Sequence, residues 1–173
     1  MKEYVNYEQS KRRLEYTNAE RKSLDCLFSM MNVKLSKTIK QHQLEWTHST
    51  QSKGCPYDCL VTVKSYDGFI VKKFIVEVKV RKDDWPSYFL EQYKLKQLKA
   101  LAKEHPEYEI LYINFTPSEC LIYNLSTIKL PKLEKREMSY KTFKNDGKTK
   151  IKKIYNLDKS LAKRIKFTEN DRI

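Results

Sequence analysis

The clearest pattern of apolar and polar residues lies between residues 57 and 81. In the second half of residues 69–81, every second residue is apolar, and Glu77 and Lys79 stand between them. Because successive side chains of a strand point to opposite faces, this pattern predicts a strand with both charges on one face. Residues 57–65 form a second β-prone stretch, and the Asp-Gly pair at 67–68 is typical of a hairpin turn. We therefore predict a β-hairpin over these two stretches.

Before the hairpin, apolar residues recur at helical spacing. Asn18 can cap a helix that runs to about Met31, and Glu20 lies four residues before Leu24 on the apolar stripe of that helix. Two interpretations of Glu20 stay open. It is either a half-exposed acid that the helix dipole favours near the N-terminus, or a carboxylate directed at a functional site. The stripe follows the i, i+3, i+4, i+7 pattern of Leu24, Leu27, Phe28 and Met31.

After the hairpin, Asp84 and Pro86 mark the start of a second helix, which we expect to run to about Glu104. Residues 108–115 form a nearly continuous apolar run and predict a strand. A strand, a helix and a strand in succession make a βαβ unit, so we expect this strand to pair in parallel with the hairpin strand. Residues 120–125 predict a further strand.

Four other stretches have weaker patterns. Residues 33–35 and 43–47 could each be a strand, and residues 150–157 alternate weakly. Residues 159–166 are consistent with a short helix. We expect one α/β domain, with a core in residues 1–128 and a basic extension in residues 129–173 that packs on or completes the same domain.

Charge adds a second kind of information. The 173-residue chain carries a net charge of +13, and residues 129–173 hold 15 Lys and Arg against 6 Asp and Glu, a balance of +9. This excess favours a polyanionic partner such as nucleic acid. The alternative is a base-composition effect, because an AT-rich genome also yields many lysines and the 3 glycines seen here.

The remaining composition narrows the class of protein. No apolar run approaches the roughly 20 residues of a membrane span, and the first residues lack the apolar segment of a signal peptide. We expect a soluble intracellular protein from a bacterium or a phage-infected host. The four cysteines lack the spacing of a zinc site and are expected to be free thiols.

The hairpin also brings candidate chemistry together. Asp58 opens the first strand, so pairing would place it near Glu77 on the second, beside Lys79. Two carboxylates beside a lysine suit a divalent-metal site, because hard cations prefer oxygen ligands. The alternative is an exposed Glu77–Lys79 pair on a solvated face. Against it, Ile75 shares that face and a helix is predicted to cover it, and unpaired burial of charge is costly.

These residues resemble the motif of the PD-(D/E)XK nuclease superfamily, which has the restriction-endonuclease-like fold. The resemblance covers roughly residues 18–125 and rests on Asp58 in Pro-Tyr-Asp and on Glu77-Val78-Lys79. Glu20 is similar to the acid that many members carry on the first helix. Gln92 is similar to a glutamine found in small resolvases and in virus-type replication-repair nuclease domains.

The resemblance implies a mixed central sheet flanked by helices in αβββαβ order. It also implies roles: Asp58, Glu77 and Glu20 would hold Mg²⁺ or Mn²⁺, Lys79 would stabilise the transition state, and Gln92 would position phosphate or a ligand side chain. We expect further basic residues to grip the DNA backbone. These are Lys53, Arg81, Lys82, Lys96, Lys150, Lys152 and Lys153.

The expected function is therefore metal-dependent hydrolysis of DNA. Neither a recognition helix nor an aromatic stacking motif is evident, so structure-directed or nonspecific cutting is favoured over sequence-specific cutting. RNA as substrate and a homodimer both remain open. The alternatives are a nucleic-acid-binding module without catalysis and a phage-type factor that binds another protein.

Overall fold

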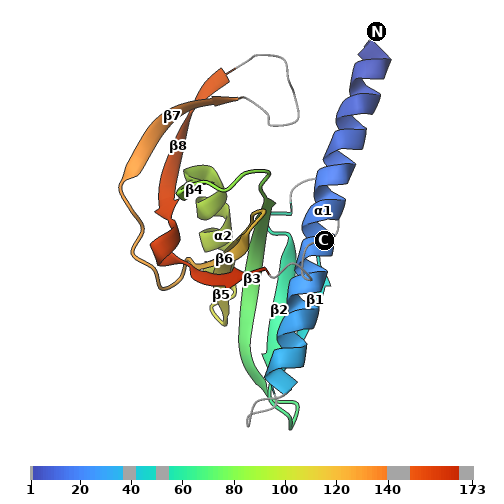
Figure 1. Cartoon of the computed structure of the whole chain (residues 1–173). Helices are drawn as coiled ribbons and strands as arrows, with labels where there is room; N and C mark the ends of the chain where they lie inside the picture. Colours follow the sequence, from blue (N-terminus) through green and yellow to red (C-terminus); the bar gives the residue numbers. More distant parts are fainter. Residues whose placement is uncertain (1, 37–41, 50–54, 140–148, 168–173) are drawn as a thin grey trace.

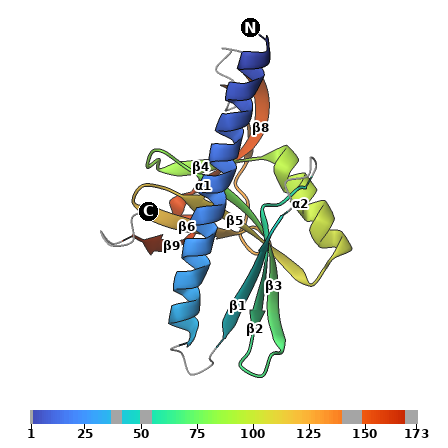
Figure 2. The same ribbon diagram turned by 90° about the vertical axis from the view of Figure 1, so that its right-hand side faces the viewer.

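The structure is a computed structural model that describes residues 2–36, 42–49, 55–139 and 149–167. Two sheets and two helices form its layers (Figures 1 and 2). The long helix α1 (Lys2–Ser36) covers one face of a six-stranded sheet, and the helix α2 (Gln92–Glu104) lies on the other face with a three-stranded sheet. The predicted α/β class with a mixed central sheet flanked by helices is confirmed.

The central sheet contains the predicted hairpin and the predicted parallel strand. All neighbouring strands are antiparallel except β3 and β5, which are parallel. Gly68, in the hairpin turn, has a φ of 80°, which only glycine adopts without strain. In order across the sheet, the strands are β1 (Gln43–His48), β2 (Cys59–Lys64), β3 (Ile70–Val80), β5 (Tyr108–Phe115), β6 (Glu119–Asn124) and β9 (Lys163–Lys166).

The first helix is longer than predicted at both ends, and its N-terminal half extends beyond the strands of the central sheet (Figure 1). The strand considered for residues 33–35 is wrong, because Met31 and Leu35 continue the apolar stripe and pack on the core. The side chain of Asn32 also holds the end of the helix against the sheet edge. Its amide donates to the Leu44 carbonyl at 3.0 Å, and its oxygen accepts from the Leu44 amide at 2.6 Å.

The second helix begins later than predicted. Residues predicted as its first turn form β4 (Ser87–Glu91), and α2 begins at Gln92. Tyr88 and Leu90 alternate into the core, and β4 pairs antiparallel with β8 (Thr149–Asp158). This partner lies some sixty residues further along the chain, so local helix signals could not reveal it.

The basic C-terminal segment contributes strands to both sheets. The three-stranded sheet has the order β4-β8-β7, where β7 is Leu133–Ser139, and β9 pairs with β6 at the edge of the central sheet. The weak alternation at residues 150–157 corresponds to β8. The helix considered for residues 159–166 is wrong, since a single 3-10 turn (Lys159–Leu161) leads into β9. A division of the chain at residue 128 stays a prediction.

Two apolar cores lie on the two faces of the central sheet. Leu24 and Phe28 of α1 pack on one face, while Leu95 and Leu98 of α2 pack on the other. The four cysteines are free thiols, as predicted. Among the described helices, none is long and apolar enough to cross a membrane.

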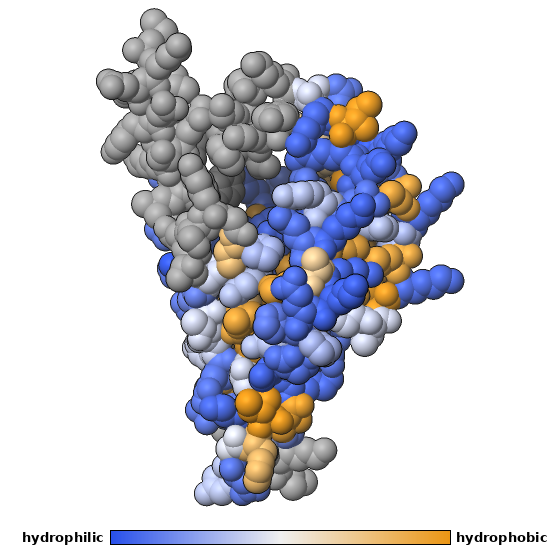
Figure 3. Space-filling model, turned by 180° about the vertical axis from the view of Figure 1, so that it is seen from behind, coloured by the Kyte–Doolittle hydropathy of each residue, from blue (hydrophilic) through white to orange (hydrophobic). Residues whose placement is uncertain are grey.

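The surface seen in Figure 3 is largely hydrophilic. An apolar group stands at its narrow lower end, where Figure 1 places the β2–β3 turn. The large hydrophobic side chains exposed around that turn are Tyr66, Phe69, Ile70 and Val71.

Candidate active site

The candidate site lies where β2 separates from β3. The two strands pair as far as Cys59 and Val76, and the Asp58 amide still donates to the Val76 carbonyl at 2.9 Å. Beyond that point, the Asp58 side chain replaces a backbone partner, because the Val78 amide donates to Asp58 Oδ2 at 2.8 Å. Asp58 thus ends the pairing and is fixed beside the C-terminal part of β3, as the hairpin prediction required.

Glu77 is the most unusual side chain of the site. It is only 1% exposed, yet it lies between two cations: Lys79 Nζ is 3.0 Å from Oε1, and Lys94 Nζ is 2.8 Å from Oε2. Neither carboxylate oxygen has a hydrogen-bond partner of good geometry among the described residues. Burial raises the pKa of Glu77, and the ammonium group of Lys79 opposes that shift. The exposed Glu77–Lys79 pair considered above is therefore not what the structure shows for Glu77.

Lys79 contacts both Glu77 and Glu20 as well as a backbone carbonyl. Besides its contact with Glu77, its ammonium group lies 3.2 Å from Glu20 Oε1 and donates to the Val78 carbonyl at 2.7 Å. Burial acts to lower the pKa of Lys79, but the carboxylates of Glu77 and Glu20 outweigh burial and raise it. Lys79 therefore carries a positive charge throughout the physiological range.

Glu20 reaches this cluster from α1. The helix begins at Lys2, so Glu20 lies in its middle, and the interpretation of a dipole-favoured acid in the first turn is wrong. Its side chain is 18% exposed, and burial raises the pKa of its carboxyl group while Lys79 counteracts the shift. Glu20 thus faces the cluster, as the second interpretation held.

Lys94 was missed by the sequence analysis. It projects from α2, and besides its contact with Glu77 it donates to the Pro56 carbonyl at 3.3 Å. Lys94 stands four residues before Leu98 and seven before Leu101, on the apolar side of the helix. A charge on an apolar stripe is the same signal that singled out Glu20, so the sequence did contain it.

Gln92 lies at the start of α2 and is half-buried. The polar contacts within the described part of the chain do not join its side chain to Asp58, Glu77, Lys79 or Glu20. A role for Gln92 in positioning phosphate stays a prediction.

Arg81 continues the network along β3. Its Nε donates to Asn114 Oδ1 at 2.9 Å, one terminal nitrogen donates to the Tyr112 hydroxyl at 2.9 Å, and its guanidinium lies 5.1 Å from the centre of the Phe89 ring. Asn114 is opposite Lys79 in the β3–β5 register, and its buried Nδ2 has no partner among the described residues. Neither Asn114 nor Tyr112 was identified from the sequence, since both lie in an ordinary apolar strand pattern.

The predicted DNA-binding lysines have different environments. Lys152 is 11% exposed and lies 2.7 Å from Glu91 Oε1, so its charge is already paired. Lys53 lies outside the described residues. The exposed members of the set are Lys82, Lys96, Lys150 and Lys153.

The ligands available to a metal are oxygens. Within the described ranges, no group of three or more His, Cys, Asp or Glu side chains is arranged to hold a metal ion. However, the Asp58 carboxylate, the buried oxygens of Glu77 and the Val78 carbonyl are the donor types that Mg²⁺ and Mn²⁺ prefer. These residues therefore fit a hard divalent cation, while Glu20 as a third ligand stays a prediction.

Comparisons with known proteins give limited information. No protein-family model matches the sequence, and a search of curated proteins finds no match. The chain is similar to the solved structure of Hjc, a Holliday junction resolvase from the archaeal hyperthermophile Archaeoglobus fulgidus, with a TM-score of 0.49 and 14% identity. The match covers 83% of this chain and 89% of that chain. A likeness of this degree identifies neither a family nor an activity.

Proposed function

We propose that this chain is a metal-dependent nuclease that hydrolyses phosphodiester bonds of DNA inside the cell. The observation that carries the proposal is Glu77, a fully buried carboxylate held between Lys79 and Lys94 next to Asp58. Burying such a cluster is expensive compared with an apolar core of the same volume. Ionisable groups whose pKa values are shifted by burial and by a specific charged partner cluster at functional sites.

Each residue has a role that follows from its chemistry. Asp58, Glu77 and the Val78 carbonyl would hold Mg²⁺ or Mn²⁺. A divalent cation at such a site polarises the scissile phosphate and lowers the pKa of bound water. Lys79 supplies a fixed positive charge for the phosphate oxygens as negative charge develops on them. Gln92 is proposed to position the phosphate.

Glu20 and Lys94 would position the residues that contact the metal and the phosphate. Glu20 fixes the Lys79 ammonium group from the α1 side, and we also propose it as an additional metal ligand or as a partner of metal-bound water. Lys94 fixes one oxygen of Glu77, which leaves the orientation of the carboxylate defined. Lys94 is a positioning residue in this scheme, since its contacts are with protein groups.

DNA binding would depend on the exposed lysines. The net charge of +13 attracts the phosphate backbone without reading sequence, which suits structure-directed or nonspecific cleavage. A binding module without catalysis would use the same charge, but it would have no need for the buried Glu77–Lys94 pair. RNA cleavage and dimerisation are further options that the same site would permit.

The test is cleavage of purified DNA. We expect the protein to cut supercoiled plasmid or branched oligonucleotides in Mg²⁺ or Mn²⁺, and to stop when EDTA is added. If folded protein binds DNA but cuts neither substrate in either metal, the chain is a binding module and the proposal fails.

A further inference from the structure

An exposed tryptophan, Trp85, follows Lys79 of the candidate site by six residues and has no part in the proposed cleavage mechanism. Trp85 is 57% exposed and stands in the loop between β3 and β4. Trp46, the other tryptophan of the chain, is half-buried, and its Nε1 donates to Asp25 Oδ1 at 2.7 Å. Trp offers a large, rigid apolar face together with a polar N–H, which is why tryptophan is enriched at binding interfaces.

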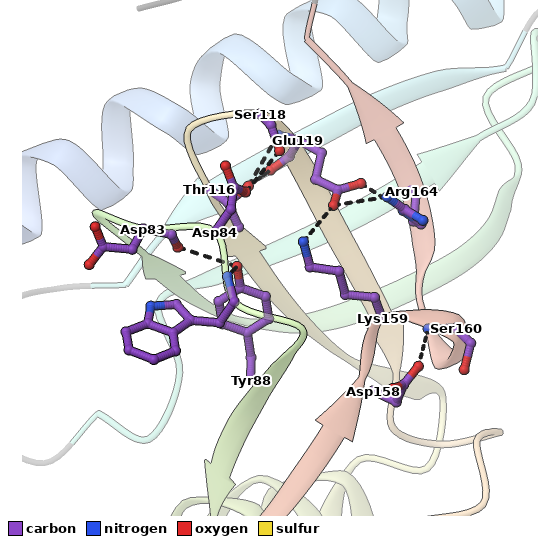
Figure 4. Close-up of polar contacts among 11 residues, drawn as sticks. Asp83, Asp84, Tyr88, Thr116, Ser118, Glu119, Asp158, Lys159, Ser160 and Arg164 are labelled. Carbon is purple, nitrogen blue, oxygen red and sulfur yellow. Dashed lines mark hydrogen bonds and ion pairs between the residues drawn. The ribbon is translucent and has the colours of Figure 1, made fainter.

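The loop around Trp85 is held in place by hydrogen bonds (Figure 4). The buried Tyr88 hydroxyl accepts from the Trp85 amide at 2.9 Å and donates to the Asp83 carbonyl at 3.3 Å. On the other side, the Ser118 hydroxyl donates to Asp84 Oδ1 at 2.8 Å. The backbone that carries the indole is therefore preorganised, which lowers the entropy cost of binding through it.

Tyr88, which accepts the hydrogen bond from the Trp85 amide, also links this loop to the candidate site through Arg81. The Arg81 guanidinium lies 5.8 Å from the centre of the Tyr88 ring and hydrogen-bonds Asn114, the register neighbour of Lys79. Trp85 follows Lys79 by six residues, so their Cα atoms are at most about 20 Å apart. That distance corresponds to a few nucleotides of DNA.

The charges around Trp85 indicate whether its ring would bind a phosphate or a base of DNA. Asp83 and Asp84 directly precede Trp85 and balance the charges of Arg81 and Lys82, so the acids next to the indole disfavour a phosphate at its ring, while the exposed Lys82 can still bind one. Stacking of an aromatic ring on a base needs no cation and is tolerant of sequence. Inside a duplex the bases are already stacked, so free base faces are found on unpaired bases and on the two terminal base pairs.

We propose that Trp85 stacks on an unpaired base of DNA beside the candidate active site. The substrate class is then DNA with single-stranded or unpaired segments. This inference rests on the proposed nuclease function, because it names the substrate of that site. Stacking itself can be measured without cleavage.

The experiment is a fluorescence titration with EDTA present, using an oligo(dT) strand and a blunt duplex as probes. We expect oligo(dT) to quench the tryptophan emission of the wild type. In Trp85→Phe the remaining Trp46 emission should not respond. Trp85→Ala should weaken oligo(dT) affinity roughly 5- to 100-fold, as the loss of one base–aromatic stack does, and change duplex affinity less than about 2-fold. Trp85→Phe should retain most of the affinity.

Tyr66→Ala is the matched control, because Tyr66 is also exposed but lies at the other end of β3. Three results would overturn the stacking proposal: emission that does not respond to oligo(dT), equal losses of affinity for strand and duplex in Trp85→Ala, or dissociation of a wild-type oligomer by that variant in sedimentation. The last would assign Trp85 to a protein interface. Quenching without any DNA cleavage in Mg²⁺ would leave stacking supported and refute the nuclease function alone.

Discussion

Lys94 Nζ lies 2.8 Å from Oε2 of the buried Glu77, so an ion pair between this carboxylate and the half-buried Lys94 joins α2 to β3 at the candidate site. Lys79 contacts the other oxygen of the same carboxylate. Glu77 therefore has a cation at each oxygen, and the two ion pairs constrain the orientation of the carboxylate. This arrangement makes the orientation of Glu77 depend on a residue that lies outside the Glu-x-Lys motif.

Replacing Lys94 should show that the position of Glu77 depends on this lysine. Lys94→Met keeps an unbranched side chain one atom shorter than lysine but removes the charge, which leaves a buried carboxylate with one cation. We expect a loss of up to about 3 kcal/mol in the free energy of unfolding, measured by urea denaturation, and at least a tenfold loss of cleavage rate. Lys96→Met, two residues further along α2 at an exposed position, is the control. Equal stability and activity of the two variants would refute the positioning role.

Lys79 should affect the rate of DNA cleavage but have little effect on the affinity for Mg²⁺. We expect Lys79→Ala to lower the single-turnover rate roughly 10²- to 10³-fold, the range for removal of one preorganised charge-stabilising group. The Mg²⁺ concentration for half-maximal rate should stay similar or fall, because the lysine repels the cation. Lys79→Arg should restore only part of the rate, since a planar guanidinium does not reproduce a compact ammonium. A wild-type rate in the alanine variant would show that the Glu-x-Lys match is coincidental.

The link between the C-terminal segment and the central sheet can be tested through pH. Glu119 is 3% exposed and contacts Arg164 Nε at 2.6 Å and Lys159 Nζ at 3.0 Å (Figure 4). Burial acts to raise the pKa of Glu119, but hydrogen bonds from Arg164 and Lys159 outweigh it and lower the pKa. A lowered pKa in the folded state means that Glu119 stabilises the protein above the ordinary value of 4.5, and that this stability is lost as the pH falls further.

We expect Glu119→Gln to cost about 2 kcal/mol at pH 7, because the three charge-assisted hydrogen bonds that Glu119 accepts from Arg164 and Lys159 are weakened or lost. The difference from wild type should shrink as the pH falls below 4.5, when wild-type Glu119 also becomes protonated. Thermal unfolding at several pH values measures both effects. Glu134→Gln changes the same formal charge at an exposed position and serves as control. A cost for Glu119→Gln that is independent of pH would contradict the ionic interpretation.

The exposed lysines should determine the salt dependence of DNA binding. Deleting the C-terminal segment would not test this, because β8 and β9 belong to the two sheets. Substitution of Lys82, Lys96 and Lys153 by Gln should instead reduce the slope of log K against log salt by roughly 0.9 for each B-DNA phosphate that the protein no longer neutralises. Lys152→Gln should change the slope less, since Lys152 is paired with Glu91. If Lys152→Gln reduces the salt slope more than the exposed-lysine substitutions do, DNA does not bind along the exposed lysines.

Much of the central sheet could be predicted from the sequence because its signals are local. The alternation around Glu77 and the Asp-Gly turn specify the hairpin, and the strand–helix–strand succession specifies the parallel pairing of β3 and β5. The grouping of Glu20 with Lys79 and Glu77 followed from one acid on an apolar stripe. The roles of these residues in catalysis stay predictions.

The errors arose where distant partners decide the structure. Residues 87–91 form a strand since β8 offers them hydrogen bonds, and residues 163–166 form a strand because β6 does. The Asp84–Pro86 start signal and the helical spacing of Leu161 and Ile165 could not reveal either partner. Lys94 was missed because the roles predicted on this helix went to Gln92 and Lys96, which lie two residues away on either side and therefore about half a turn from Lys94.

The most direct test of the nuclease account compares Glu77→Gln and Asp58→Asn with the wild type. Both substitutions keep the size of the side chain and its capacity to accept a hydrogen bond, and both remove a negative charge from the proposed metal site. We expect DNA cleavage in Mg²⁺ to fall at least 100-fold in each, while DNA affinity measured in EDTA stays equal or rises because repulsion of phosphate is relieved. If either variant, folded and at the same concentration, cuts DNA at the wild-type rate, the site lies elsewhere and the account is wrong.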